Sequence, residues 1–229
     1  MLLRWKKALR LDRPRIPPPP ITFDAPFYIV GEGSADAAFV DELLKSRGVP
    51  NNNFFVREAE GRTGFERHLD AVQTSSDRPK LTRLAVVADN DLDPAQSFAS
   101  VQDALQRTGF PVPASPSTIV TGPPVVGVFM MPGPGVQGNL ETLLTEAVLA
   151  TNPQFQPCLN DFASCMVAPV GWDINKTSKM RIQLLIAGCC EEDPACSVAY
   201  IWNKSGNPIP LSSSRFDPLY NFLQQIVTT

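Results

Sequence analysis

The sequence predicts an α/β fold with a mostly parallel sheet and helices on both faces, because short apolar runs alternate with segments of helical periodicity. The clearest apolar runs are residues 26–30, 84–88 and 125–130. The second run is uninterrupted, which is typical of a central parallel strand buried on both faces. Carboxylates follow the first two runs, at Glu32 and Asp89, so the predicted sheet carries a candidate ligand site at its carboxyl end.

The other elements follow in strand–helix order. Ser34 is expected to cap the first helix, whose first turn holds Asp36 and which ends near Gly48. Asp93 is expected to cap the third helix. Residues 152–169 are expected to be mostly irregular. Further strands are expected at residues 54–56 and 118–120, and further helices around residues 65–72, 140–148, 180–186 and 216–226.

Charge divides the 229 residues into two parts. Residues 1–20 carry six basic residues and one acidic residue, whereas residues 21–229 carry 14 basic and 22 acidic residues. The prolines at 17–20 predict a polyproline II spacer. We therefore expect a basic, proline-rich arm over residues 1–20 and a single α/β domain over residues 21–229 that ends in a helical extension.

The arm has two interpretations: a solvated terminus, or a segment that contacts nucleic acid, an acidic partner or an anionic lipid headgroup. Charges interrupt its apolar stretches, so it does not resemble a signal peptide. No run approaches the roughly 20 apolar residues of a membrane span. The five cysteines include no C-x-x-C pair, which favours reduced thiols over zinc ligands. We expect a cytoplasmic protein without a membrane partner; its oligomeric state is not indicated.

Three carboxylates, those of Glu32, Asp89 and Asp91, form the strongest candidate site. Asp89 and Asp91 stand two residues apart at the end of a strand, so both side chains can reach one cation. Carboxylates gathered at one sheet edge repel one another unless a cation lies between them. Hard oxygen ligands suit Mg²⁺ or Mn²⁺, which predicts a divalent metal site.

Other candidates also have a purely structural interpretation. Asp91 can be a turn residue ahead of the third helix. Asp36 and Glu141 can be ordinary acidic residues in the first turns of their helices. Lys176 and Lys179 can be solvated surface side chains.

Several other functions are disfavoured. His68 is the only histidine, which argues against a Ser-His-Asp hydrolase and against His-based nucleases. Gly31-x-Gly33 lacks the third glycine of a dinucleotide-binding turn, because residue 36 is an aspartate that would repel a pyrophosphate. No Walker A sequence is present, so any ATPase would be a separate partner protein.

Five motifs occur in a set order between roughly residues 26 and 227. They are Glu32-Gly33-Ser34-Ala35-Asp36, Asp89-Asn90-Asp91, Met131-Pro132 followed by Gly138-Asn139-Leu140-Glu141, Asn175-Lys176-Thr177-Ser178-Lys179, and Phe216-Asp217-Pro218-Leu219-Tyr220-Asn221-Phe222-Leu223. In this order they resemble the TOPRIM domain shared by topoisomerases, primases and OLD-family nucleases. The chain more closely resembles the small TOPRIM-like bacterial proteins of the DUF3226 family. The resemblance implies a Rossmann-like, TOPRIM-type sheet.

The resemblance also implies roles for the carboxylates. Asp89 and Asp91 are expected to hold Mg²⁺ or Mn²⁺, and Glu32 is expected to be a second ligand or a general acid/base. Asp36 and Glu141 are further candidate ligands. A metal ion beside a phosphodiester would polarise the phosphoryl oxygen, activate water and neutralise developing charge.

The resulting hypothesis is a Mg²⁺-dependent enzyme that acts on a phosphodiester in DNA or RNA, with a partner ATPase as one option. A nuclease is favoured, because the chain has no room for the further domains of a topoisomerase or primase. The resemblance also implies a basic residue near the scissile phosphate, for which Lys176 and Lys179 are the candidates. The related pattern tends to place an acidic residue after Met131-Pro132, where this chain has Gly133. The alternative is a non-catalytic module that binds nucleic acid, senses a phosphorylated ligand or contacts a partner.

Overall fold

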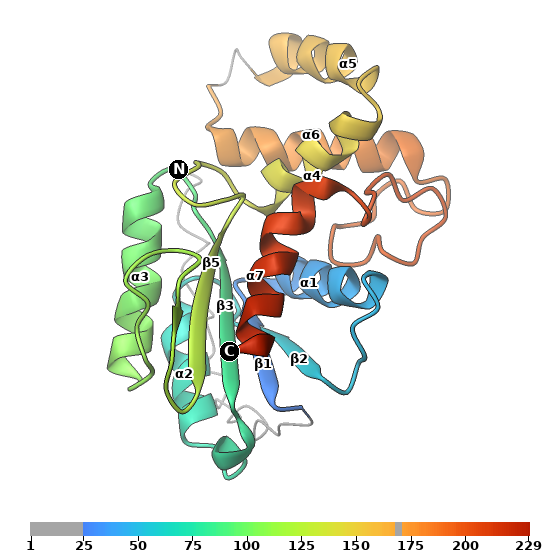
Figure 1. Cartoon of the computed structure of the whole chain (residues 1–229). Helices are drawn as coiled ribbons and strands as arrows, with labels where there is room; N and C mark the ends of the chain where they lie inside the picture. Colours follow the sequence, from blue (N-terminus) through green and yellow to red (C-terminus); the bar gives the residue numbers. More distant parts are fainter. Residues whose placement is uncertain (1–24, 168–170) are drawn as a thin grey trace, which may run out of the picture.

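The computed structural model describes residues 25–167 and 171–229 (Figure 1). Within these ranges, five strands form one sheet of order β2-β1-β3-β5-β4. The strands are β1 (Phe27–Gly31), β2 (Phe54–Glu58), β3 (Arg83–Asp89), β4 (Ile119–Val120) and β5 (Val125–Met131). β1 pairs in parallel with β2 and β3, β3 pairs in parallel with β5, and β4 is antiparallel to β5. The predicted mostly parallel sheet is therefore confirmed.

Helices cover both faces of this sheet, as the alternating pattern predicts. They are α1 (Ser34–Ser46), α2 (Gly64–Gln73), α3 (Pro94–Arg107), α4 (Leu140–Thr151), α5 (Phe155–Phe162), α6 (Ile174–Cys189) and α7 (Asp217–Thr228). Figure 1 shows α2 and α3 on one face and α1 and α7 on the other. Each face has its own apolar core, because alternate residues of β3 point to opposite faces: Ala85 and Val87 into one core, Leu84 and Val86 into the other.

The carboxyl ends of the strands lie near α4 and α6. The loop after β5 leads directly into α4, and α6 packs against α4. Figure 1 shows this pair at one end of the sheet, with α5 beyond it. α4 and α6 thus stand beside the edge where the sequence places its acidic motifs, and α5 lies farther out.

Residues 152–169 differ from the expected irregular segment, since α5 and a π-helical turn (Ala163–Val167) occupy most of it. Phe155, Leu159 and Phe162 form a short apolar stripe on α5 that packs toward α6. Pro157 lies in the first turn of α5, where its missing N–H costs little, so it does not prevent the helix. α6 also begins earlier than expected, because Asp173 caps it by accepting a hydrogen bond from the main-chain N–H of Lys176 at 2.9 Å.

The N-terminus of α1 also differs in detail from the prediction. Ser34 is the first residue of the helix, and Gly33 is the capping residue. The predicted cap at Asp93 is confirmed, because its side chain accepts a hydrogen bond from the N–H of Gln96 at 3.0 Å. The predicted arm over residues 1–20 lies outside the described residues. Among the helices of the described ranges, α6 is the longest at 16 residues, and none has the length and hydropathy of a membrane span.

Candidate functional site

The site begins where two neighbouring strands end. Glu32 follows β1 and Asp89 ends β3, and the parallel register pairs Gly31 with Val87. The N–H of Glu32 donates to the carbonyl of Val87 at 3.0 Å, and the N–H of Asp89 donates to Oε2 of Glu32 at 3.3 Å. The two carboxyl-bearing strand ends therefore lie side by side, as the parallel sheet predicts.

The segment after β3 is braced from both sides. Asn90 is fully buried, and its amide donates to the carbonyls of Gly133 at 2.6 Å and Val136 at 2.7 Å. Asp91 adopts a left-handed backbone with φ of +52° and exchanges two main-chain hydrogen bonds with Gly138, at 2.8 and 2.9 Å. Only small polar side chains tolerate such a backbone readily, which suits an aspartate here. The Asp89-Asn90-Asp91 turn is thus fixed by the loop that precedes α4.

The N-terminus of α4 completes this corner of the site. The N–H of Leu140 donates to Oδ1 of Asp89 at 2.9 Å, so a carboxylate faces the positive end of the helix. Asn139 caps the helix by accepting from the N–H of Thr142 at 3.1 Å. The Ser178 hydroxyl of α6 donates to the same Asn139 oxygen at 2.7 Å, which ties α6 to this corner.

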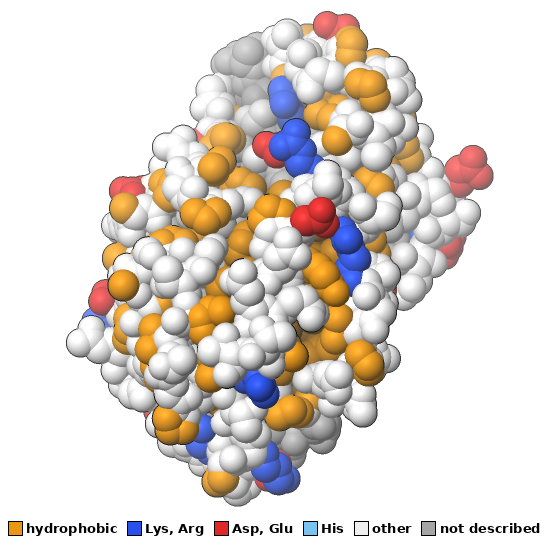
Figure 2. All heavy atoms as spheres, viewed as in Figure 1, with side chains coloured by type: hydrophobic (Ala, Val, Ile, Leu, Met, Phe, Trp, Pro, Cys, Tyr) orange, Lys and Arg blue, Asp and Glu red, His pale blue; other side chains and the backbone are white. Residues whose placement is uncertain are grey.

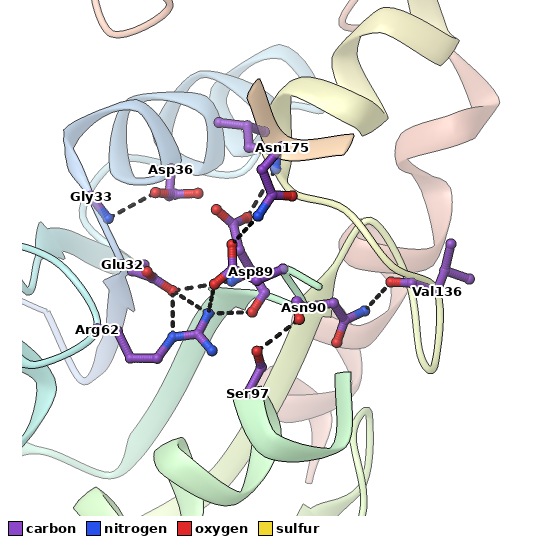
Figure 3. Close-up of polar contacts among 11 residues, drawn as sticks. Glu32, Gly33, Asp36, Arg62, Asp89, Asn90, Ser97, Val136 and Asn175 are labelled. Carbon is purple, nitrogen blue, oxygen red and sulfur yellow. Dashed lines mark hydrogen bonds and ion pairs between the residues drawn. The ribbon is translucent and has the colours of Figure 1, made fainter. Parts of the chain in front are cut away.

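Asp36 is the most deeply buried of the candidate carboxylates, with 6% of its surface exposed. One oxygen, Oδ2, accepts a hydrogen bond from the N–H of Gly33 at 2.7 Å and so caps α1. The other oxygen, Oδ1, is buried and has no hydrogen-bond partner in residues 25–167 and 171–229. Figure 3 shows this oxygen on the side of Asp36 that faces Asp89. The structural interpretation of Asp36 therefore accounts for one oxygen and leaves the other unexplained.

Burial and mutual repulsion raise the pKa values of these carboxyl groups. Burial is the main cause for Asp36, whose pKa rises to about 7, with further contributions from Glu32 and Glu141. Burial likewise raises the pKa of Asp89 well above its ordinary value, and Asp36, Glu32 and Glu141 add to the rise. Burial also raises the pKa of Glu141, and the charge of Asp91 contributes. These five carboxylates therefore act on one another electrostatically as one cluster.

Arg62 is a site residue that the sequence analysis does not identify. Its Nη2 atom lies 2.9 Å from Oε2 of Glu32 and 3.0 Å from Oδ2 of Asp91. The same nitrogen donates to the main-chain carbonyl of Asp89. Figure 3 shows the guanidinium reaching into the cluster between Glu32 and Asp89. One arginine from the loop after β2 therefore neutralises part of the acidic edge.

The loop that carries Arg62 is shaped by glycines. Gly61 has a φ of +95°, and its N–H donates to the carbonyl of Glu32 at 2.8 Å. A side chain at Gly64 would place its Cβ 1.7 Å from the carbonyl oxygen of Ala59. The flanking glycines of Gly61-Arg62-Thr63-Gly64 are the signal that could have drawn attention to this arginine, since they stand at the carboxyl end of a predicted strand.

α6 contributes a second polar side chain. The amide of Asn175 donates to Oδ1 of Asp91 at 2.8 Å. Lys179 lies one turn further along α6, and its charge lowers the pKa of Glu141 against the larger effect of burial. Both lysines of this helix are exposed, and the ammonium group of Lys176 has no hydrogen bond or ion pair within the described residues. Of the two candidate lysines, Lys179 is therefore the one that the structure brings to the cluster.

The fit of a metal ion to this site is mixed. All donors are carboxylate or amide oxygens, the chemistry that Mg²⁺ prefers, and the buried Oδ1 of Asp36 lacks a partner. In residues 25–167 and 171–229, however, no three Asp, Glu, His or Cys side chains are arranged to hold a metal ion. Arg62 instead bridges Glu32 and Asp91. Metal ligation by Glu32, Asp36, Asp89, Asp91 and Glu141 stays a prediction.

His68 lies away from this edge. Its Nε2 atom is 2.8 Å from the hydroxyl of Tyr28, and burial lowers its pKa to about 4. The two rings stack with centroids 5.9 Å apart. His68 therefore has a packing environment and takes no part in the acidic cluster.

Comparison with curated proteins gave no match. Among solved structures, two of the C-terminal region of the OLD protein from Xanthomonas campestris pv. campestris are similar to this chain. The one phased with mercury is 13% identical and has a TM-score of 0.45, and the similarity covers 90% of this chain and 98% of the other. The one phased with platinum is 14% identical with a TM-score of 0.42, covering 88% and 92%. Residues 27–228 match the family described as "Protein of unknown function (DUF3226)", so the chain belongs to the DUF3226 family.

Proposed function

We propose that the carboxyl edge of the sheet binds Mg²⁺ or Mn²⁺ and acts on a phosphodiester bond of a nucleic acid, as a nuclease. The observation that carries the proposal is the buried, unpartnered Oδ1 of Asp36 inside a cluster of carboxylates with raised pKa values. An oxygen of this kind is costly unless something occupies the space beside it. A divalent cation would satisfy that oxygen and relieve the repulsion among its neighbours.

The roles follow from position. Asp89 and Asp91, with Glu32 from the adjacent strand, would be the main ligands, and Asp36 and Glu141 border the same cluster. The metal would supply Lewis-acid polarisation of the phosphoryl group and a water of lowered pKa. Lys179 is exposed beside the cluster, where its ammonium group would attract a phosphate. Figure 2 shows one face of the molecule, on which basic and acidic side chains are interspersed and no broad basic patch is seen.

A second candidate function is a non-catalytic module that binds a phosphorylated ligand or a partner. The ion pairs of Arg62 with Glu32 and Asp91 favour it, because they neutralise the acidic edge without a metal. Gly133 also favours it, since the family pattern would place a further acidic side chain there and the space around its Cβ position is open.

Incubation with single- and double-stranded DNA and RNA in Mn²⁺ or Mg²⁺, with and without a candidate partner ATPase, tests the first function. The wild-type protein should cleave at least one substrate, and Glu32→Gln and Asp89→Asn should each remove most of the activity while the protein stays folded, as circular dichroism would show. The matched control is Asp93→Asn, which makes the same chemical change but retains a good helix cap outside the cluster.

The two lysines refine the test. Lys179→Ala should reduce cleavage less than Glu32→Gln or Asp89→Asn does, because the lysine only supplements the positive charge of the metal at the phosphate, and Lys176→Ala should have a smaller effect still. Absence of cleavage of every substrate, together with Mn²⁺ binding that depends on Asp89, would favour the non-catalytic module.

A further inference from the structure

Arg62 stands where a cation is needed in the candidate site. Its Nε and Nη2 atoms lie 3.3 and 2.9 Å from Oε2 of Glu32, and Nη2 lies 3.0 Å from Oδ2 of Asp91. It also donates to the carbonyl of Asp89. Its side chain is 19% exposed, so these interactions are partly shielded from water. A single guanidinium thus joins the ends of β1 and β3.

Main-chain hydrogen bonds hold the loop in place, whereas the guanidinium is held, among the described residues, only by its contacts with Glu32, Asp89 and Asp91. Main-chain hydrogen bonds run from Gly61 to Glu32 and from Gly64 to Gly61, both at 2.8 Å. An arginine side chain has several rotatable bonds with staggered minima, and this one keeps 19% of its surface exposed to solvent. Rotation of the side chain alone would therefore carry the guanidinium out of the site.

The guanidinium and a metal ion compete for these ligands. Two cations that contact the same carboxylates lie only a few ångströms apart, and their repulsion is strong in a partly buried site. Arginine is always protonated, so the conflict cannot be relieved by loss of a proton. Either the guanidinium or the divalent ion occupies the space between Glu32 and Asp91.

We propose that Arg62 is the internal counter-ion of this acidic site, and that a divalent cation binds by displacing its guanidinium from Glu32 and Asp91. The inference rests on the proposed function, because it requires a cation site. It accounts for the absence of three converging carboxylates in the described residues: the guanidinium sets the spacing of Glu32 and Asp91. Arg62 thereby determines how much free metal the protein needs.

Titration calorimetry with Mn²⁺, checked by the paramagnetic signal of free Mn²⁺, tests this inference without an activity assay. Arg62→Ala should bind Mn²⁺ at least about tenfold more tightly than the wild type, equivalent to about 1.4 kcal/mol. Arg62→Lys, which keeps the charge but loses the planar fork, should fall between the two. The control is Arg67→Ala, because Arg67 pairs with Glu60 near the same loop and makes no ion pair with the cluster within the described residues.

The outcomes separate this inference from the proposed function. If the wild type binds Mn²⁺ and Arg62→Ala binds it equally or more weakly, only the counter-ion role is overturned. That result is expected if Arg62 merely supports the structure, because its loss would then leave the site less ordered. Binding by Arg62→Ala but not by the wild type supports the inference in its strongest form. Loss of Mn²⁺ binding in every protein overturns both proposals. If circular dichroism shows that Arg62→Ala is unfolded, Arg62→Lys decides, and it must bind more tightly than the wild type.

Discussion

Asp36 links local structure to the chemistry of the site. One of its oxygens accepts a hydrogen bond from Gly33 at the start of α1, and the other is buried without a partner in the part of the chain that the structure describes. The hydrogen bond from Gly33 uses only one carboxylate oxygen, so capping of α1 does not explain why the second oxygen is buried. When Asp36 is charged, this burial destabilises the metal-free fold. The surroundings of Asp36 therefore favour a charged carboxylate only when a cation is bound beside it.

A pH dependence follows from this burial. The pKa of Asp36 is raised from its ordinary 3.8 to about 7, so the folded state takes up a proton that the unfolded state lacks between these values. Asp36 should therefore make the free energy of unfolding in EDTA fall as the pH rises from about 4 to about 7, and its own contribution is at most about 1.4 kcal/mol for each tenfold drop in proton concentration. Melting temperatures measured across this range check it.

The variant Asp36→Asn isolates the contribution of this residue. It should retain the hydrogen bond from Gly33, flatten the pH dependence and raise the melting temperature near pH 8. Asp93→Asn, at a helix cap outside the cluster, should leave the slope of the wild type unchanged. A slope that is the same in Asp36→Asn and in the wild type would contradict the assignment.

The positions of some site residues could be predicted from the ends of the strands, whereas the position of another depends on the geometry of a loop. Glu32 and Asp89 could be paired in advance because parallel strands end at one edge. Arg62 could not, because positive φ angles at Glu60 and Gly61 turn the chain back toward the sheet in a way that residue spacing does not reveal. The proximity of Lys179 to Glu141 likewise depends on how α6 packs on α4.

Among the elements, the turn between β2 and α2 is tightly packed. It brings Arg62 to the site, and it has no room for a side chain at Gly64, where a Cβ would lie 1.7 Å from the carbonyl oxygen of Ala59. The loop between β5 and α4 contrasts with it, since a Cβ at Gly133 would meet nothing within 4 Å. Two glycines that border the same site therefore differ in their tolerance of substitution.

Matched alanine substitutions test this contrast. Gly64→Ala should lower the free energy of unfolding by more than about 2 kcal/mol, because the main chain must move away from a clash. Gly133→Ala should be neutral or stabilising by up to about 1 kcal/mol, because alanine restricts the unfolded chain. Urea denaturation followed by circular dichroism measures both. Equal effects of the two substitutions would show that the turn is not rigid.

Element types with long apolar patterns were predictable, whereas short or polar ones were not. The uninterrupted run of β3 and the stripes of α1, α3 and α7 identify themselves by periodicity. α5 has only eight residues and contains Pro157, so its three apolar positions suggest an irregular segment. The first turn of α6 carries the polar residues Asn175, Lys176 and Thr177 without a buried apolar stripe. Asn175 contacts Asp91 at the acidic edge.

In the whole molecule, the two apolar cores on opposite faces of the sheet are built from described residues between Phe27 and Ile226. The same part of the chain is acidic, whereas six of the chain's 20 basic residues stand in residues 1–20. An acidic body repels the phosphates of a nucleic acid, so a basic segment is the natural source of attraction. We therefore expect the arm to affect binding through its charge and to leave the stability of the fold unchanged.

Deletion of residues 1–20 tests this separation. The melting temperature should stay the same, because those residues carry no apolar stripe that the cores require. If the arm binds nucleic acid, the affinity should fall and its dependence on salt should become less steep, since fewer counterions are released. Fluorescence anisotropy at several salt concentrations measures both quantities, and mutation of the arm's basic residues to glutamine serves as the control for chain length. Unchanged affinity and salt dependence would show that the arm is a solvated terminus. The attraction for phosphate would then have to come from the site itself, where Lys179 and a bound cation are the sources of positive charge.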